Sequence, residues 1–146
     1  MTGNISIWSE ELIKNCNGQE AACLEVGCGT GMSSLWLAMN GKSVTALDYT
    51  ESSVQLVRAA AQKLNLDNID VIQCDATKDL PFAEKQFDYI FQAGLLEHFE
   101  VDEQIELLCN WAKYGKYMIS MIPNAASIPY QVGKKLWKIM EHGNMG

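Results

Sequence analysis

Short apolar runs alternate with segments of helical periodicity along most of this chain. The apolar runs lie at 21–26, 42–48, 69–74, 87–91 and 116–122, and each has the length of one β-strand. Runs that are apolar at consecutive positions, rather than at every second one, are typical of parallel strands buried on both faces. Because these strands alternate with helices, the pattern predicts an α/β fold: a doubly wound, mostly parallel sheet with helices on both faces and right-handed crossovers.

Four segments carry the spacing of amphipathic helices. The first covers 6–16 and stops at the pair Asn17-Gly18, a typical helix end. The second follows the first strand over 34–39, and the third has Thr50 as its predicted N-cap. The buried stripes predicted for the third and fourth helices are Val54, Val57, Ala61 and Leu64, and Val101, Ile105, Leu108 and Ala112.

A glycine-rich turn follows the first strand. Residues 24–31 read LEVGCGTG, so an apolar run with one carboxylate, Glu25, gives way to Gly27, Gly29 and Gly31 just before a helix. Glycines let the backbone take positive φ angles and let a ligand approach the main chain without Cβ atoms in the way. The turn therefore indicates a nucleotide-like cofactor, although glycine turns that serve only the packing of a doubly wound fold give the same pattern.

The spacing of the glycines and the charge beside them narrow the choice of cofactor. Dinucleotide sites use G-x-G-x-x-G, whereas here the third glycine comes one position early and Met32 stands where that fingerprint has glycine. The Glu25 carboxylate would repel a pyrophosphate, but it suits a cofactor that carries ammonium and sulfonium charges. S-adenosylmethionine has those charges and no phosphate. A nicotinamide-dependent oxidoreductase stays as the less favoured alternative.

With its leading carboxylate, the glycine pattern resembles motif I of the class I S-adenosylmethionine-dependent methyltransferases, E/D-x-G-x-G-x-G. The resemblance runs from residue 21 to residue 124 and includes an F-D-x-I run at 87–90 that leads to L-E-H at 96–98. It implies a sheet of strand order 3-2-1-4-5, S-adenosylmethionine as the cofactor and methyl transfer as the reaction. In open α/β sheets of this kind the ligand lies at the carboxyl ends of the strands.

Acidic residues at the ends of the second and third strands fit such a ligand. Asp48 can accept both hydroxyls of a ribose, as an acidic residue at this place does in the family, or it can cap the next helix. Tyr49 can stack on the adenine. Asp75, with the N–H of Ala76, resembles the family's adenine contact, and a solvated loop acid is its alternative. The resemblance also implies that Gln92 lies near the methionine part. The predicted cofactor site comprises Glu25, Gly27, Cys28, Gly29, Thr30, Gly31, Asp48, Tyr49, Asp75, Ala76 and Gln92.

No catalytic residue is assigned from the sequence. His98 has a reference pKa of about 6.5, which suits proton removal near neutral pH, but a histidine on an apolar segment is more often a structural group. Glu97 fits either a polar anchor on the cleft wall or an acid at a helix start, and Asp88 is expected at a strand start away from the cofactor. Methyl transfer from a sulfonium is an in-line displacement in which positive charge disappears. Alignment and exclusion of water can therefore suffice without an acid or base.

The overall composition argues against several other classes of protein. With 11 basic and 18 acidic residues the net charge is −7, which disfavours a nucleic-acid partner because phosphate binding needs clustered Lys and Arg. The five cysteines form no C-x-x-C pair and have no histidine at metal-ligand spacing, so we expect reduced thiols and no metal. The N-terminus lacks a signal-peptide layout, and no apolar run approaches the roughly 20 residues of a membrane span. We therefore expect a cytoplasmic protein.

The C-terminal part departs from the family pattern. Family members continue after the fifth strand into a closing antiparallel hairpin, and residues 125–146 leave no room for one. This segment predicts one helix or lid, so the chain is either a C-terminally truncated piece of a longer enzyme or a sheet with an exposed fifth strand. Such an edge is a pairing hazard, and we expect the last helix or a second copy of the chain, in a homo-oligomer, to cover it.

These observations predict a single domain over residues 1–146, with an N-terminal helix in 1–18, that binds S-adenosylmethionine. The predicted function is methyl transfer to an unidentified small-molecule acceptor. The alternative is a truncated or non-catalytic module that holds the cofactor without a complete acceptor pocket.

Overall fold

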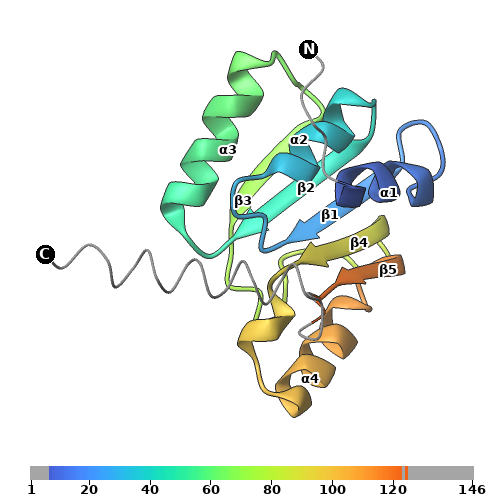
Figure 1. Ribbon diagram of the computed structural model, residues 1–146, viewed down its shortest axis with the longest axis vertical. Helices are drawn as coiled ribbons and strands as arrows, with labels where there is room; N and C mark the ends of the chain where they lie inside the picture. Colours follow the sequence, from blue (N-terminus) through green and yellow to red (C-terminus); the bar gives the residue numbers. More distant parts are fainter. Residues whose placement is uncertain (1–6, 123, 125–146) are drawn as a thin grey trace, which may run out of the picture.

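The computed structural model describes residues 7–122 and residue 124 (Figure 1). The five strands confirm the predicted apolar runs, with each boundary shifted by at most two residues. The predicted helix or lid at 125–146 lies outside the described residues. The helices among the described residues are too short or too polar to span a membrane.

In chain order the elements are α1 (Ile7–Asn15), β1 (Ala22–Val26), α2 (Met32–Met39), β2 (Ser43–Asp48), α3 (Glu51–Lys63), β3 (Ile69–Gln73), β4 (Phe87–Ala93), the 3-10 helix η1 (Leu96–His98), α4 (Val101–Trp111) and β5 (Gly115–Met121).

The strands form one parallel sheet in the order β3-β2-β1-β4-β5, which confirms the predicted topology. The order reverses at β1, because the chain returns from the β3 edge along residues 74–86, a stretch without helix or strand, and adds β4 on the other side of β1. Ligand-binding crevices form at such reversal points, at the carboxyl ends of the strands. Within the described residues β5 is paired on one side only, with β4.

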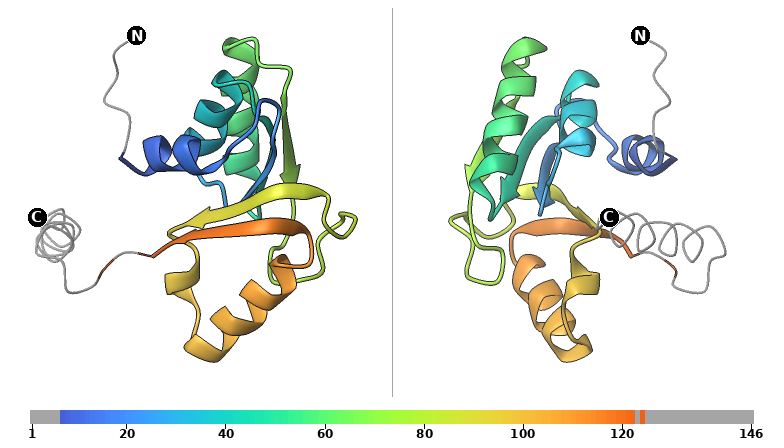
Figure 2. Two further views of the ribbon diagram at one scale, coloured as in Figure 1. Left: turned by 90° about the vertical axis from the view of Figure 1, so that its right-hand side faces the viewer. Right: turned by 60° about the vertical axis from the view of Figure 1, so that its left-hand side comes forward.

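The sheet separates two layers of helices (Figures 1 and 2). α1, α2 and α3 cover one face, whereas α4 packs on the other face, below β4 and β5 in the left-hand view of Figure 2. Side chains of β1 alternate between the layers: Leu24 and Val26 pack in one cluster with Trp111 of α4, while Cys23 packs with Leu12 of α1. Full burial of a Leu or Val side chain is worth about 1.5–3 kcal/mol, so both layers hold the strand that leads into the glycine turn.

The predicted buried face of the fourth helix is wrong. Val101 and Ile105 are 68% and 54% exposed, and the buried side of α4 is formed instead by Leu107 and Trp111. The indole of Trp111 is the largest side chain on this helix, and its Nε1 donates a hydrogen bond of 2.8 Å to the Ala76 carbonyl oxygen. Burying this ring while satisfying its N–H turns the helix so that the start of the predicted stripe faces solvent.

The third helix keeps most of its predicted stripe. Val54, Val57 and Ala61 are buried, whereas Leu64 is 39% exposed because the helix ends one residue earlier and Leu64 is its C-cap. Thr50 is the N-cap residue, as predicted, but its hydroxyl makes no capping hydrogen bond.

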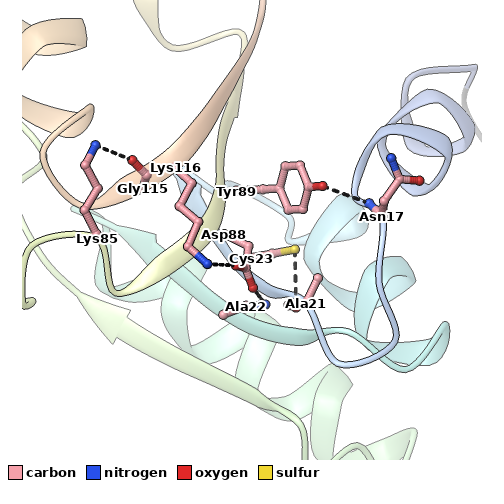
Figure 3. A network of polar contacts seen from close by, with 9 residues as sticks. All are labelled: Asn17, Ala21, Ala22, Cys23, Lys85, Asp88, Tyr89, Gly115 and Lys116. Carbon is pink, nitrogen blue, oxygen red and sulfur yellow. Dashed lines mark hydrogen bonds and ion pairs between the residues drawn. The ribbon is translucent and has the colours of Figure 1, made fainter.

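The amino ends of three strands are joined by one carboxylate (Figure 3). Asp88, near the start of β4, accepts the N–H of Ala22 of β1 at 3.0 Å and pairs with the Lys116 ammonium of β5 at 2.7 Å. The hydrogen bond from Lys116 holds the pKa of Asp88 below its ordinary value. Asp88 therefore lies at the end of the sheet opposite the carboxyl ends of the strands, as the sequence predicted.

Candidate functional site

A cavity of about 460 Å³ opens at the carboxyl ends of β1 and β2, at the reversal point of the sheet. Its walls come from the turn after β1, the junction of β2 and α3, the loop after β3, and the segment between β4 and the end of α4. Five of the predicted site residues line it: Gly27, Asp48, Tyr49, Asp75 and Ala76. The other lining residues are Leu47, Thr50, Thr77, Leu95, Phe99 and Trp111.

The three glycines of the turn have different roles. All have positive φ angles: +71° for Gly27, +52° for Gly29 and +69° for Gly31. A Cβ atom on Gly27 would lie 2.9 Å from the Leu95 side chain, and one on Gly31 would overlap the Val57 side chain. A Cβ atom on Gly29 would meet nothing within 4 Å. Packing therefore requires glycine at the first and third positions, whereas Gly29 leaves open space beside its backbone, where a ligand can approach.

Asp48 ends β2 and binds the backbone of two different loops. Its Oδ2 accepts the N–H of Gly29 at 2.8 Å, and its Oδ1 accepts the N–H of Thr50 at 2.8 Å. The carboxylate thus binds the N-cap residue of α3 and also lines the cavity, and its contact with a ribose stays a prediction. Since a carboxylate oxygen has two lone pairs, each oxygen keeps the capacity to accept a hydrogen bond from a ligand.

Asp75 and Tyr49 line the same cavity from the loops after β3 and β2. Asp75 Oδ1 accepts the N–H and the hydroxyl of Thr77 at 3.0 and 2.6 Å, and its Oδ2 lies 3.4 Å from the Lys78 ammonium. The hydrogen bonds from Thr77, assisted by Lys78, hold the pKa of Asp75 below its ordinary value, so the group is a carboxylate at neutral pH. The Tyr49 ring is 74% exposed, which leaves aromatic surface available to a planar ligand group.

Glu25 is not among the residues that line the cavity. Its side chain is 4% exposed, and its Oε2 accepts both the N–H and the hydroxyl of Ser34, at 3.1 and 2.5 Å. Ser34 is the third residue of α2, whose N-cap, Gly31, has no side chain to bind the free N–H groups of the first turn. The strand carboxylate thus caps this helix from outside. Burial, with a smaller contribution from the nearby Asp48 charge, raises the pKa of Glu25 to about 7 against the two hydrogen bonds from Ser34.

Gln92 lies behind the cavity wall rather than on it. The side chain is 1% exposed, and its Nε2 donates to the Ser120 hydroxyl at 2.5 Å and to the Met121 carbonyl oxygen at 3.3 Å. Its Oε1 accepts the N–H of Leu95 at 3.0 Å. Gln92 therefore ties the end of β5 to the turn after β4, and this turn places Leu95 against Gly27.

The other predicted residues of the glycine turn also lie outside the cavity lining: Cys28, Gly29, Thr30 and Gly31. Cys28 is buried in the core cluster beneath α3, and burial raises the pKa of its thiol to about 12, so the thiol is neutral. Thr30 is exposed. All five cysteines are free thiols, which agrees with the expectation from their spacing.

Glu97 and His98 lie in η1, and both side chains are exposed. Neither lines the cavity, whose wall on this side is made by Leu95, Phe99 and Trp111. The sequence analysis missed this apolar wall, although the signal for Trp111 was present in its spacing of four residues from Leu107. Across residues 7–122 and 124, no three His, Cys, Asp or Glu side chains come together in a way that could hold a metal ion.

Comparisons with known proteins agree with this geometry. A sequence model of a methyltransferase domain matches residues 23–116. N-methyltransferase 4 of Papaver somniferum is 33% identical over 93 residues, which cover 62% of this chain and 26% of that protein. The ubiquinone biosynthesis O-methyltransferase of Coxiella burnetii is 38% identical over 77 residues, which cover 51% of this chain and 31% of that protein. The chain spans less than half the length of the curated relatives it matches.

Solved structures of methyltransferases have the same fold as this chain. The crystal structure of an S-adenosylmethionine-dependent methyltransferase from Aquifex aeolicus matches with a TM-score of 0.62 at 22% identity, over 93% of this chain and 78% of that one. The shared fold, the glycine turn beside the cavity and the match to the domain model over most of the chain all agree. The chain therefore belongs to the family of S-adenosylmethionine-dependent methyltransferase domains, the family that its glycine motif resembles.

Proposed function

We propose that this chain binds S-adenosylmethionine in the cavity above β1 and β2 and transfers the methyl group to a small-molecule acceptor. The observation that carries the proposal is the pair of carboxylates, Asp48 and Asp75, which line one cavity from the ends of adjacent strands. Beside them the glycine turn leaves open backbone space at Gly29. Two carboxylates would repel a phosphate ligand, whereas the hydroxyl and amino groups of adenosine are donors that carboxylates accept.

The adenosine half of the cofactor fits residues from two loops and one apolar wall. Asp48 is assigned to the ribose hydroxyls, because its oxygens keep accepting capacity beside the open space at Gly29. Asp75 is assigned to the adenine amine, and Tyr49 supplies an exposed ring for stacking. Phe99 then borders the adenine from the apolar side of the cavity.

The methionine half is assigned to the region of the glycine turn. Its ammonium group requires a negative partner, and Glu25 at the end of β1 offers a carboxylate there. Gln92 contributes by holding Leu95, which packs against Gly27 and forms the adjoining wall. The role of Gln92 in the proposal is therefore support for the wall.

The chain's own contribution to the reaction is alignment. S-adenosylmethionine supplies an electrophilic methyl group on a sulfonium ion when it is bound. Asp48 and Asp75 hold the adenosine end in one orientation, and Leu95 with Phe99 and Trp111 provides an apolar wall that excludes water. Because the sulfonium charge disappears during the transfer, an acceptor that is already nucleophilic needs no acid or base from the chain.

The acceptor is assigned to small molecules with a nucleophilic nitrogen or oxygen. The named relatives include one N-methyltransferase and one O-methyltransferase, which supports either atom. A net charge of −7 disfavours nucleic acid as the acceptor, because such a substrate would need clustered basic residues.

Calorimetry on the purified chain with S-adenosylhomocysteine and with NAD tests the proposal. S-adenosylhomocysteine keeps the adenosine and amino-acid groups of the cofactor and cannot react. We expect it to bind in the micromolar range, which corresponds to about −8 kcal/mol, and we expect no measurable binding of NAD. Tighter binding of NAD would contradict the proposal and favour an oxidoreductase. Binding of S-adenosylhomocysteine without methyl transfer in a screen of amines and alcohols with labelled cofactor would favour a non-catalytic module.

A further inference from the structure

A buried carboxylate with one free oxygen lies at the end of β1, two residues before the glycine turn. Both hydrogen bonds that Glu25 receives come from Ser34, and both end on Oε2. Oε1 receives none from the described residues. Among the described residues, the side-chain nitrogen or oxygen atoms that are fully enclosed and have no hydrogen-bond partner are Trp8 Nε1 and Trp36 Nε1. Oε1 of Glu25 is not one of them. Oε1 is therefore the oxygen of this buried carboxylate whose accepting capacity the described residues leave unused.

The surroundings of Glu25 contain no compensating cation within the described residues. From β2 it faces Asp48, another carboxylate, and from the glycine turn it faces the thiol of Cys28. α2 supplies Ser34 and carries no charged residue, and the neighbour on β4, Phe91, is apolar. An ionised carboxylate in such a place loses its hydration without gaining an opposite charge, so the protonated form is favoured. The burial that raises the pKa of Glu25 to about 7 agrees with this reasoning.

We propose that Ser34 is a positioning residue for the cofactor: it fixes Glu25 through Oε2 so that Oε1 receives the ammonium group, and Glu25 releases one proton as that group binds. This inference rests on the proposed function and makes cofactor binding proton-linked. The proton leaves Oε1 for solvent, the ammonium group keeps its three protons, and an ion pair replaces a neutral acid. Ser34 stabilises this ion pair because both of its hydrogen bonds go to the carboxylate.

Cofactor affinity therefore depends on pH in a defined direction. Below the midpoint of Glu25 ionisation, each pH unit strengthens binding about tenfold, because one proton is released for each cofactor bound. Well above the midpoint the carboxylate is already ionised, and the affinity becomes level. Removing the Ser34 hydroxyl takes away one of the two donors that favour the charged form. The midpoint should then move to higher pH by about one unit.

The test is calorimetry with S-adenosylhomocysteine between pH 5.5 and 8.5, in two buffers of different ionisation enthalpy so that the released protons are counted. The wild-type protein should release close to one proton per ligand at the acid end and none at the basic end. Glu25→Gln should bind more weakly and with no dependence on pH. Ser34→Ala should show the shifted midpoint. Ser33→Ala is the matched control, because Ser33 is buried next to Ser34 on α2 and donates no hydrogen bond to Glu25, and it should keep the wild-type profile.

The outcomes separate this inference from the proposed function. If S-adenosylhomocysteine does not bind at any pH, the proposed function fails and the inference fails with it. If it binds to the wild-type protein without proton release, only the inference is overturned, and this measurement needs no variant to fold. A Ser34→Ala profile that is parallel to the wild-type profile and merely weaker also overturns the positioning role of Ser34.

Discussion

The carboxylate of Asp48 accepts the N–H of Gly29 across 2.8 Å, so the end of β2 holds the middle of the turn that follows β1. The other oxygen of the same carboxylate accepts the N–H of Thr50, the N-cap residue of α3. One side chain thus joins two loops that border the cavity. A ligand that binds Asp48 is consequently coupled to the backbone of both loops.

Asp48→Ala is expected to weaken the binding of S-adenosylhomocysteine by about 1.5–3 kcal/mol, because the ligand loses a charged acceptor of hydrogen bonds. This corresponds to a roughly 10- to 150-fold higher Kd in calorimetry. The matched control is Asp70→Ala, which removes an exposed carboxylate of β3 outside the cavity and should leave the Kd unchanged. An unchanged affinity in Asp48→Ala would remove Asp48 from the site.

Gly29 and Gly31 offer a matched pair of substitutions that separates packing from ligand approach. Gly31→Ala should lower the free energy of unfolding by about 2–4 kcal/mol, because the new Cβ atom has an unfavourable φ and overlaps Val57. Gly29→Ala meets no neighbour, so we expect only the backbone cost of about 1–2 kcal/mol together with weaker ligand binding. Urea unfolding and calorimetry on both variants measure these effects. Wild-type affinity in Gly29→Ala would show that no ligand occupies the open space.

The sequence alone predicted the sheet and its ligand end, because the signals for both are local. The strand at 22–26 is an apolar run with one carboxylate, Glu25, and three glycines at a fixed spacing mark the turn after it. Asp48 ends one apolar run and Asp75 directly follows the next, and parallel strands bring their carboxyl ends to one edge. The cavity that both carboxylates line therefore lies at the edge of the sheet that the sequence predicted for the ligand.

The parts that the sequence did not predict depend on partners far along the chain. On α4, the stripe that begins at Val101 and the stripe that contains Leu107 and Trp111 are both apolar, and only the Ala76 carbonyl and the packed indole decide between them. That Gln92 lies near the methionine part of the cofactor stays a prediction, whereas its bond to Ser120, which the sequence did not predict, depends on how β5 lies beside β4. The spacing of Leu107 and Trp111 offers the second stripe without deciding for it, and no local pattern around Gln92 shows its partner on β5.

Gln92→Leu tests the support of the cavity wall at nearly constant side-chain volume. The substitution leaves the buried N–H of Leu95 without its acceptor, and we expect the free energy of unfolding to fall by about 1–3 kcal/mol. Calorimetry should also show weaker ligand binding, because Leu95 is no longer fixed against the glycine turn. Gln62→Leu, on the exposed side of α3, is the control and should change neither quantity. A Gln92→Leu protein with wild-type stability and affinity would show that the wall does not depend on this side chain.

Glu25 should make the stability of the protein without ligand fall as the pH rises. The pKa of this group is about 7 in the folded protein, against an ordinary value of 4.5, so the folded state binds the proton more tightly than the unfolded chain. Its contribution is then complete below about pH 4.5 and is lost as the pH rises to about 7. At about 1.4 kcal/mol per pH unit, this gap corresponds to about 3 kcal/mol. Glu25→Gln has no proton to lose, so its free energy of unfolding relative to wild type should rise by that amount between pH 4.5 and 7.5 in urea titrations and then become level. A difference that stays constant with pH would mean that Glu25 titrates in the folded protein as it does in the unfolded chain, and the burial of its charge would then carry no cost.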